Sequence, residues 1–84
     1  MQIKTAIEWQ SVSSTLKAEL HRIGYNPDLN KMLLNISIMI TELSKLEVIS
    51  RRIKKDYDLI EPLIKINSAI KHLEQLILMA KLMQ

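Results

Sequence analysis

The sequence has no cysteine and no phenylalanine, and its 84 residues include one glycine and two prolines. The absence of cysteine excludes disulfides, thiol chemistry and thiolate metal sites. A single glycine excludes the glycine-rich loops that hold nucleotide phosphates. Sheets and their turns draw on glycine, proline, aromatic residues and β-branched alternation, and most of these are scarce here. The composition therefore predicts an all-α protein.

Long apolar runs and a leader-like N-terminus are also missing. The longest unbroken apolar run covers residues 76–80, far short of the roughly 20 residues that span a bilayer. Residues 1–14 lack the apolar core of a signal peptide. The net charge of +3 is mildly basic and is compatible with many partners. We expect one helical domain over residues 1–84, in a cytoplasmic chain without membrane contact.

Two stretches divide the chain into predicted helices at about residues 3–23, 27–55 and 59–83. At the first break, Gly24 suits the left-handed residue that often follows a helix. Asn26 can cap the next helix, and the proline after it fits a first helical turn, where no N–H is needed.

At the second break, Asp58 and Glu61 have the spacing of a capping box, whereas Pro62 disfavours a helical conformation at the residue before it. The third helix could therefore begin at Leu59 or at Pro62. One long helix that is kinked here stays open as an alternative.

Apolar residues recur with heptad spacing along the second and third predicted helices, which indicates a coiled-coil-like seam between them. The seam positions of the second helix are Leu29, Met32, Ile36, Met39, Leu43, Leu46, Ser50 and Ile53. Those of the third are Leu59, Leu63, Ile66, Ile70, Leu73, Ile77 and Ala80. The first helix has a weaker apolar face, formed by Trp9, Val12, Leu16, Leu20 and Ile23. The pattern predicts a long antiparallel hairpin with a shorter first helix packed on it.

Both long helices also carry apolar residues off the seam, and near the C-terminus these go almost all the way round the helix. A helix of that kind is normally buried on all sides, and three helices cannot surround each of their members. We therefore expect self-association, most simply as a two-fold dimer that forms a larger bundle. The alternative is a three-helix monomer whose surface is unusually apolar. The residues expected at this interface are Leu33, Ile38, Ile40, Ile70, Leu76, Met79 and Met83.

Residues for catalysis or metal binding are not arranged in a recognisable pattern. His21 lies at the end of the first predicted helix, where its charge suits the helix dipole, and His72 has no second histidine at a metal-binding spacing. We therefore predict no enzyme activity, no metal site, no cofactor and no small-molecule substrate. Five glutamates fall at positions expected to be exposed to solvent: Glu8, Glu19, Glu42, Glu47 and Glu74.

A basic run ends the second predicted helix, and acidic residues follow it. Residues 51–55 contain Arg51, Arg52, Lys54 and Lys55, and residues 56–61 contain three acids. One interpretation is that basic groups suit the negative end of one helix dipole and acids the positive end of the next. The other is a patch for nucleic acid or an acidic partner, with Tyr57 stacking on a base.

Two functions remain open from the sequence. The first is a small oligomer that binds and modulates a protein, as an inhibitor, an antitoxin-like antagonist or an adaptor of the kind that phages and mobile elements carry. Its support is the excess of apolar residues. The alternative is an accessory protein that binds RNA or DNA through residues 51–55, although no established nucleic-acid-binding motif is present.

Overall fold

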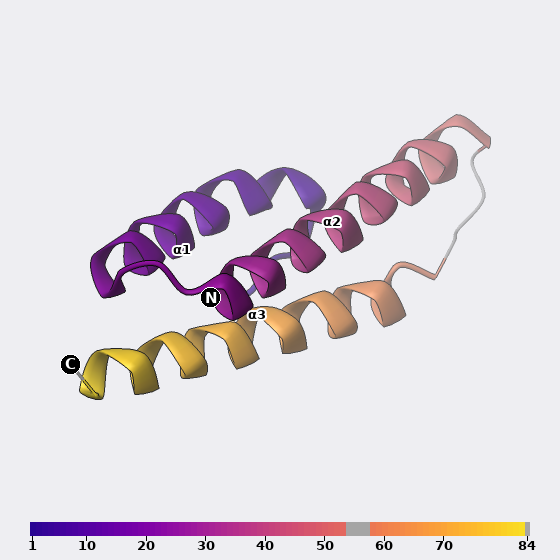
Figure 1. The fold of residues 1–84 in the computed structure, drawn as a ribbon. Helices are drawn as coiled ribbons and strands as arrows, with labels where there is room; N and C mark the ends of the chain where they lie inside the picture. The colour runs from indigo at the N-terminus through magenta and orange to yellow at the C-terminus, as the bar shows by residue number, and fades with distance from the viewer. Residues whose placement is uncertain (54–57, 84) are drawn as a thin grey trace.

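The computed structural model describes residues 1–53 and 58–83, and it confirms an all-α fold. A short 3₁₀ helix, η1 (Ala6–Glu8), leads into α1 (Trp9–Ile23), and α2 (Pro27–Ile53) and α3 (Ile60–Leu82) follow. Figure 1 shows α2 and α3 running antiparallel, with α1 packed on the pair. The molecule is elongated, measuring 50 × 18 × 16 Å. The predicted end of the second helix at residue 55 lies outside the described residues.

The boundary between α1 and α2 has the helix-ending and helix-capping residues that the sequence predicted. Gly24 adopts a φ of 91°, in the left-handed region that favours glycine, and it ends α1. The side chain of Asn26 accepts a hydrogen bond from the backbone N–H of Leu29 at 3.1 Å, as an N-terminal cap does. This cap and Pro27 in the first turn explain why α2 begins where it does.

The second break separates two distinct helices, so α2 and α3 are not one kinked helix. Asp58 Oδ1 accepts a hydrogen bond from the backbone N–H of Ile60 at 2.9 Å, and α3 begins at that residue. Pro62 therefore falls within the first turn, where its missing N–H leaves no helical bond unmade.

The first helix starts later than predicted, because the N-terminal segment (residues 1–5) is bound to α3 instead. The backbone N–H of Ile3 donates to Asn67 Oδ1 at 2.8 Å, and Asn67 Nδ2 donates to the carbonyl of Ile3 at 2.9 Å. Both backbone groups of this residue are thus unavailable to a helix. The carboxylate of Glu8 accepts hydrogen bonds from the backbone N–H groups of Lys4 and Thr5, which fixes the turn that leads into η1.

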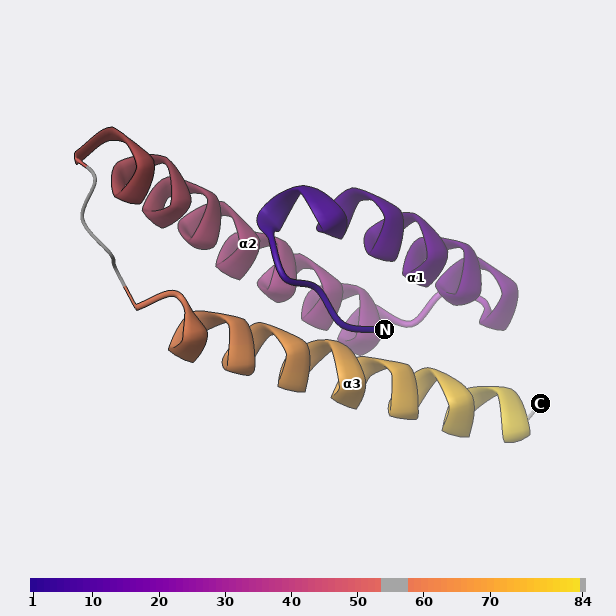
Figure 2. The ribbon, with the colours of Figure 1, turned by 180° about the vertical axis from the view of Figure 1, so that it is seen from behind.

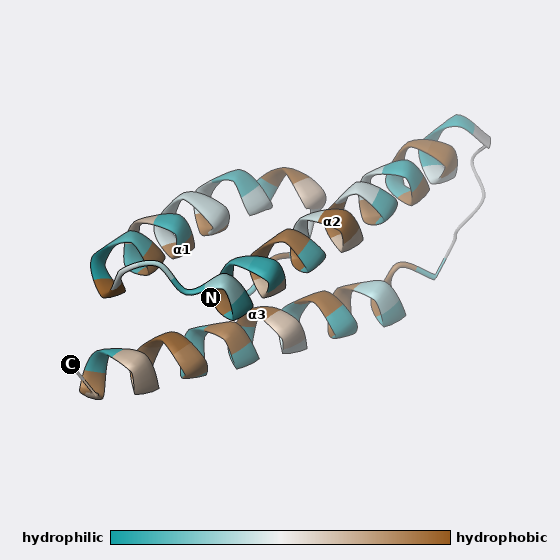
Figure 3. Cartoon of the chain, viewed as in Figure 1, coloured by the Kyte–Doolittle hydropathy of each residue, from teal (hydrophilic) through white to brown (hydrophobic). Residues whose placement is uncertain are grey.

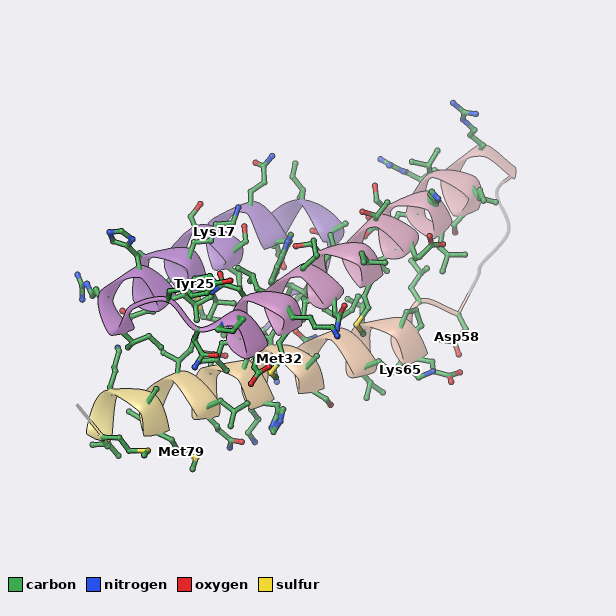
Figure 4. The ribbon with its side chains drawn as sticks, viewed as in Figure 1. Lys17, Tyr25, Met32, Asp58, Lys65 and Met79 are labelled. Carbon is green, nitrogen blue, oxygen red and sulfur yellow. The ribbon has the colours of Figure 1, made fainter. Side chains whose placement is uncertain are left out.

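One apolar core joins the three helices and the side chain of Ile3. The buried apolar residues of the helices are Trp9, Val12, Leu16 and Leu20 of α1, Leu29, Leu33, Ile36, Ile40 and Leu43 of α2, and Ile66, Ile70, Leu73 and Ile77 of α3. The predicted seam is thus largely present. Figure 4 shows Met32, one of its half-buried members, lying between α2 and α3.

The core does not extend along the whole hairpin. We call α1 with residues 27–43 and 66–82 the three-helix end, and residues 44–53 with 58–65 the two-helix end. In Figure 2, α1 lies beside the part of α2 that is nearer the C-terminus of α3, and it leaves the far part of α2 uncovered. No residue of the two-helix end, as far as the structure describes it, is fully buried.

Candidate interaction surfaces

The residues predicted for an oligomer interface fall into two groups. Leu33, Ile40 and Ile70 are buried in the chain's own core, so their apolar character is explained without a second copy. Leu76 is half-buried against that core.

The remaining predicted interface residues, Ile38, Met79 and Met83, are exposed. They lie on two different helices, and the interface as a whole stays a prediction.

Four exposed apolar side chains lie together at the C-terminal end of α3. The C-terminal apolar surface consists of Leu78, Met79, Leu82 and Met83, which are between 57% and 86% exposed. They form two pairs with a spacing of four residues, so each pair is aligned along the helix. The C-terminal turns of α3 are largely brown, for hydrophobic, in Figure 3, and Met79 points away from α1 and α2 in Figure 4.

A second set of exposed residues lies on α2, on the side away from Ile36 and Leu43. We call Ile38, Glu42, Lys45 and Ile49 the α2 outer stripe. All four are exposed, and the Lys45 ammonium lies 3.4 Å from the Glu42 carboxylate. Sequence reasoning missed Ile49, although a clue was present: it follows Ile38 by about three helical turns and therefore shares its face.

The basic end of α2 is described only in part. Arg51 and Arg52 are exposed in the last turn of α2, and Arg51 Nε donates to the carbonyl oxygen of Glu47 at 3.4 Å. Lys54, Lys55 and Tyr57 lie outside the described residues. Basic side chains in the last turn of α2 suit the negative end of its dipole, and both interpretations of the basic run stay predictions.

An open groove of about 910 Å³ lies where η1 meets α2. Its lining mixes apolar side chains, such as Ile7 and Leu59, with polar ones, such as Thr41 and Lys45. The groove lining also includes Glu47, whose carboxylate accepts a hydrogen bond from the backbone N–H of Ala6 at 3.2 Å. This groove is therefore the place where η1 binds α2.

Three of the glutamates expected to be exposed instead hold the N-terminal part of the chain in place, and all three are half-buried. Glu47 binds η1, as described above. Glu74 binds the amino group of Met1 at 2.9 Å. The pattern of a single helix could not reveal these roles, because each partner lies on another part of the chain.

The third of these glutamates, Glu19 of α1, forms an ion pair with Lys81 of α3. The hydrogen bond from Lys81 holds the pKa of the Glu19 carboxyl below its ordinary value. Desolvation opposes this effect, and the charges of Lys81 and Arg22 add to it. The pair therefore ties the C-terminal ends of α1 and α3 together when the carboxyl is ionised.

Metal-binding geometry is not found in the described part of the chain: no three His, Asp or Glu side chains gather there in a way that could hold an ion. His21 and His72 are both exposed. Within residues 1–53 and 58–83, no helix has the length and hydrophobicity to cross a bilayer. Comparison with protein-family models, with curated protein sequences and with solved structures finds no match to this chain.

Proposed function

We propose that this chain is a small, non-catalytic helical protein that self-associates and binds another protein, whose activity it modulates as an inhibitor, an antagonist or an adaptor. The observation that carries the proposal is the C-terminal apolar surface, Leu78, Met79, Leu82 and Met83. Contiguous apolar side chains at a protein's surface mark sites of association more often than scattered ones do.

The geometry of this surface suits the insertion of a helix into a groove. In that mode, an exposed helix places apolar side chains three or four residues apart into a hydrophobic groove of the partner. Leu78 with Leu82 and Met79 with Met83 have this spacing. Methionine side chains are flexible and polarisable, so they adapt to an irregular apolar wall. The proposed partner is therefore a protein with an apolar groove wide enough for one helix.

Nucleic-acid binding through the basic run is the other candidate. Arg51 and Arg52 are exposed, but residues 51–55 hold four basic side chains in all and belong to no established nucleic-acid-binding motif. Binding to nucleic acid is strongly weakened by salt, whereas apolar contacts are not. Salt dependence thus separates the two candidates.

The test begins with a photo-crosslinking residue at position 83, which identifies the bound protein in cells. Isothermal titration of the purified partner then compares Leu82→Asp with Ile7→Asp. These two side chains are 78% and 76% exposed, but Ile7 lies on η1. We expect the first substitution to raise the Kd at least about tenfold, because it places a charge in an apolar contact, and the second to leave it unchanged.

The same titration at about 50 mM and about 300 mM salt completes the test. A Kd that changes little supports a protein partner held by apolar contacts. Equal affinity of both variants would contradict the proposal, as would a crosslinked species that proves to be nucleic acid and is released by salt.

A further inference from the structure

We infer that the α2 outer stripe (Ile38, Glu42, Lys45 and Ile49) binds the same stripe of a second copy of this chain, with the two α2 helices antiparallel. This inference rests on the self-association in the proposed function and assigns it a surface. It does not depend on the protein partner at the C-terminal apolar surface, which lies on a different helix. All four side chains of the stripe are exposed and outside the core.

The spacing of the stripe is that of a helix-pairing seam. Successive members are four, three and four residues apart, the alternation that keeps a seam facing one partner helix. The stripe runs about 16 Å along the helix at 1.5 Å per residue. It lies on the side of α2 away from Ile36 and Leu43, which are buried in the chain's own core, so α2 can pair outward without giving up its inward contacts.

The order of the residues selects the partner and its direction. Along α2 the stripe reads apolar, acidic, basic, apolar. An antiparallel copy reads apolar, basic, acidic, apolar, so Ile38 meets Ile49 of the second copy and Glu42 meets Lys45 of the second copy. A two-fold axis level with the peptide between Leu43 and Ser44 makes each of these contacts twice.

A parallel arrangement of the same stripe would be unfavourable. It would place Glu42 against its own equivalent and Lys45 against its own, and like charges facing each other across an interface cost free energy. The charges thus exclude one direction and support the other. The two isoleucines at the ends of the stripe then cover the charged centre from both sides.

A second exposed surface, on α3, could also pair with a copy of itself, but its charges are not complementary in that pairing. Ile60, Ile64, Leu78 and Leu82 also share one side of that helix and are exposed. In an antiparallel pair of α3 helices, Ile60 would meet Leu82 and Ile64 would meet Leu78, but Lys71 would face its own equivalent at the two-fold axis. No acid of the same stripe lies opposite that lysine, because Asn67 would face Gln75. The charge pattern therefore points to α2.

A charge exchange tests the assignment directly. Sedimentation equilibrium at low salt, up to about 1 mM chain, measures the dimer Kd, since an interface of one helix pair is expected to be weak. Glu42→Lys and Lys45→Glu each put like charges opposite one another twice, and each should raise the Kd at least about tenfold. The double variant restores opposite charges with their signs exchanged, and its Kd should return to within about threefold of the original.

The matched control is Glu61→Lys on α3. It changes the net charge by the same amount as Glu42→Lys and also breaks an exposed pair within one helix, because Glu61 lies 3.6 Å from Lys65. Its Kd should equal that of the unaltered chain. Ile38→Asn and Ile64→Asn form a second matched pair, with side chains 56% and 60% exposed, and only the first should weaken the dimer. Circular dichroism verifies that each variant is folded.

Two adverse outcomes are distinguishable. A chain that remains monomeric up to the highest concentration would overturn both this inference and the proposed self-association. A dimer that is indifferent to the single reversals, or that the double variant fails to restore, would overturn the assignment of the α2 outer stripe alone. In neither case would the binding of a different protein at the C-terminal apolar surface be affected.

Discussion

The two ends of the hairpin share one sequence pattern but differ in burial. Leu43 and Leu46 are consecutive members of the same predicted seam on α2, yet Leu43 is fully buried at the three-helix end and Leu46 is only half-buried at the two-helix end. The same holds on α3, where Ile66 is buried and Leu63 is half-buried. The ends differ in what covers the hairpin: the buried face of α1 joins the core at the three-helix end, whereas η1 binds α2 at Glu47 of the two-helix end.

The comparison shows that a seam between two helices is insufficient for a dry core. Two helices leave their flanks open to water, and a third element is needed to close one of those flanks. The free energy of folding should therefore reside mainly at the three-helix end. The two-helix end keeps exposed isoleucines, including Ile49 and Ile60, that are available to a partner.

The largest expected effect comes from comparing one substitution in α3 at the three-helix end with one at the two-helix end. Ile70→Asp places a carboxylate in a position with no solvent exposure, and it should cost at least about 4 kcal/mol, comparable to the whole stability of a small domain. We expect an unfolded chain by circular dichroism. Ile60→Asp at the two-helix end should change stability by about 0.5 kcal/mol or less, because that side chain is exposed and an acid suits a helix start. A folded Ile70→Asp variant would contradict the conclusion that most of the folding free energy resides at the three-helix end.

A smaller effect distinguishes the ends on α2. Leu43→Ala should lower the free energy of unfolding by about 2–5 kcal/mol, since it opens a cavity in a closed core. Leu46→Ala should cost roughly 1 kcal/mol, because water already reaches that site and can fill the space. Urea unfolding followed by circular dichroism measures both. Equal costs would mean that α1 is not what separates the two ends.

The smallest effect is a pH dependence at the three-helix end. Because the pKa of Glu19 is lower in the folded chain than its ordinary value of 4.5, the ionised carboxyl stabilises the fold above that value. This contribution is lost as the pH falls through the lower, folded pKa. Lys81→Met should raise the pKa of Glu19 in an NMR titration and reduce the loss of stability in acid, whereas Lys65→Met, on an exposed pair, should not.

The seam and the helix ends were predictable because their signals are local. Gly24, Asn26 and Asp58 act on residues within a few positions of themselves, and the heptad spacing of α2 and α3 belongs to each helix separately. The start of the first helix was not predictable in this way. It depends on Asn67, a side chain far along the chain that takes both backbone groups of Ile3.

The candidate surfaces were predictable to a lesser degree. Apolar excess at the C-terminal end of α3 pointed to Met79 and Met83, which are exposed. The same reasoning placed Leu33 and Ile40 at a partner interface, because they lie off the seam with α3. A seam describes contact with one neighbour only, and α2 has a second neighbour in α1. No pattern within α2 states from which side that neighbour approaches.

The binding of the N-terminal segment to α3 has a consequence for the order in which the protein is assembled. The Ile3–Asn67 pair joins residues 64 positions apart, and the Met1–Glu74 pair joins residues 73 positions apart. Closing loops of this length costs more conformational entropy than forming the contacts within a helix. During synthesis, the Ile3–Asn67 hydrogen bonds therefore cannot form until the ribosome has passed all of α1 and α2 and the first turns of α3.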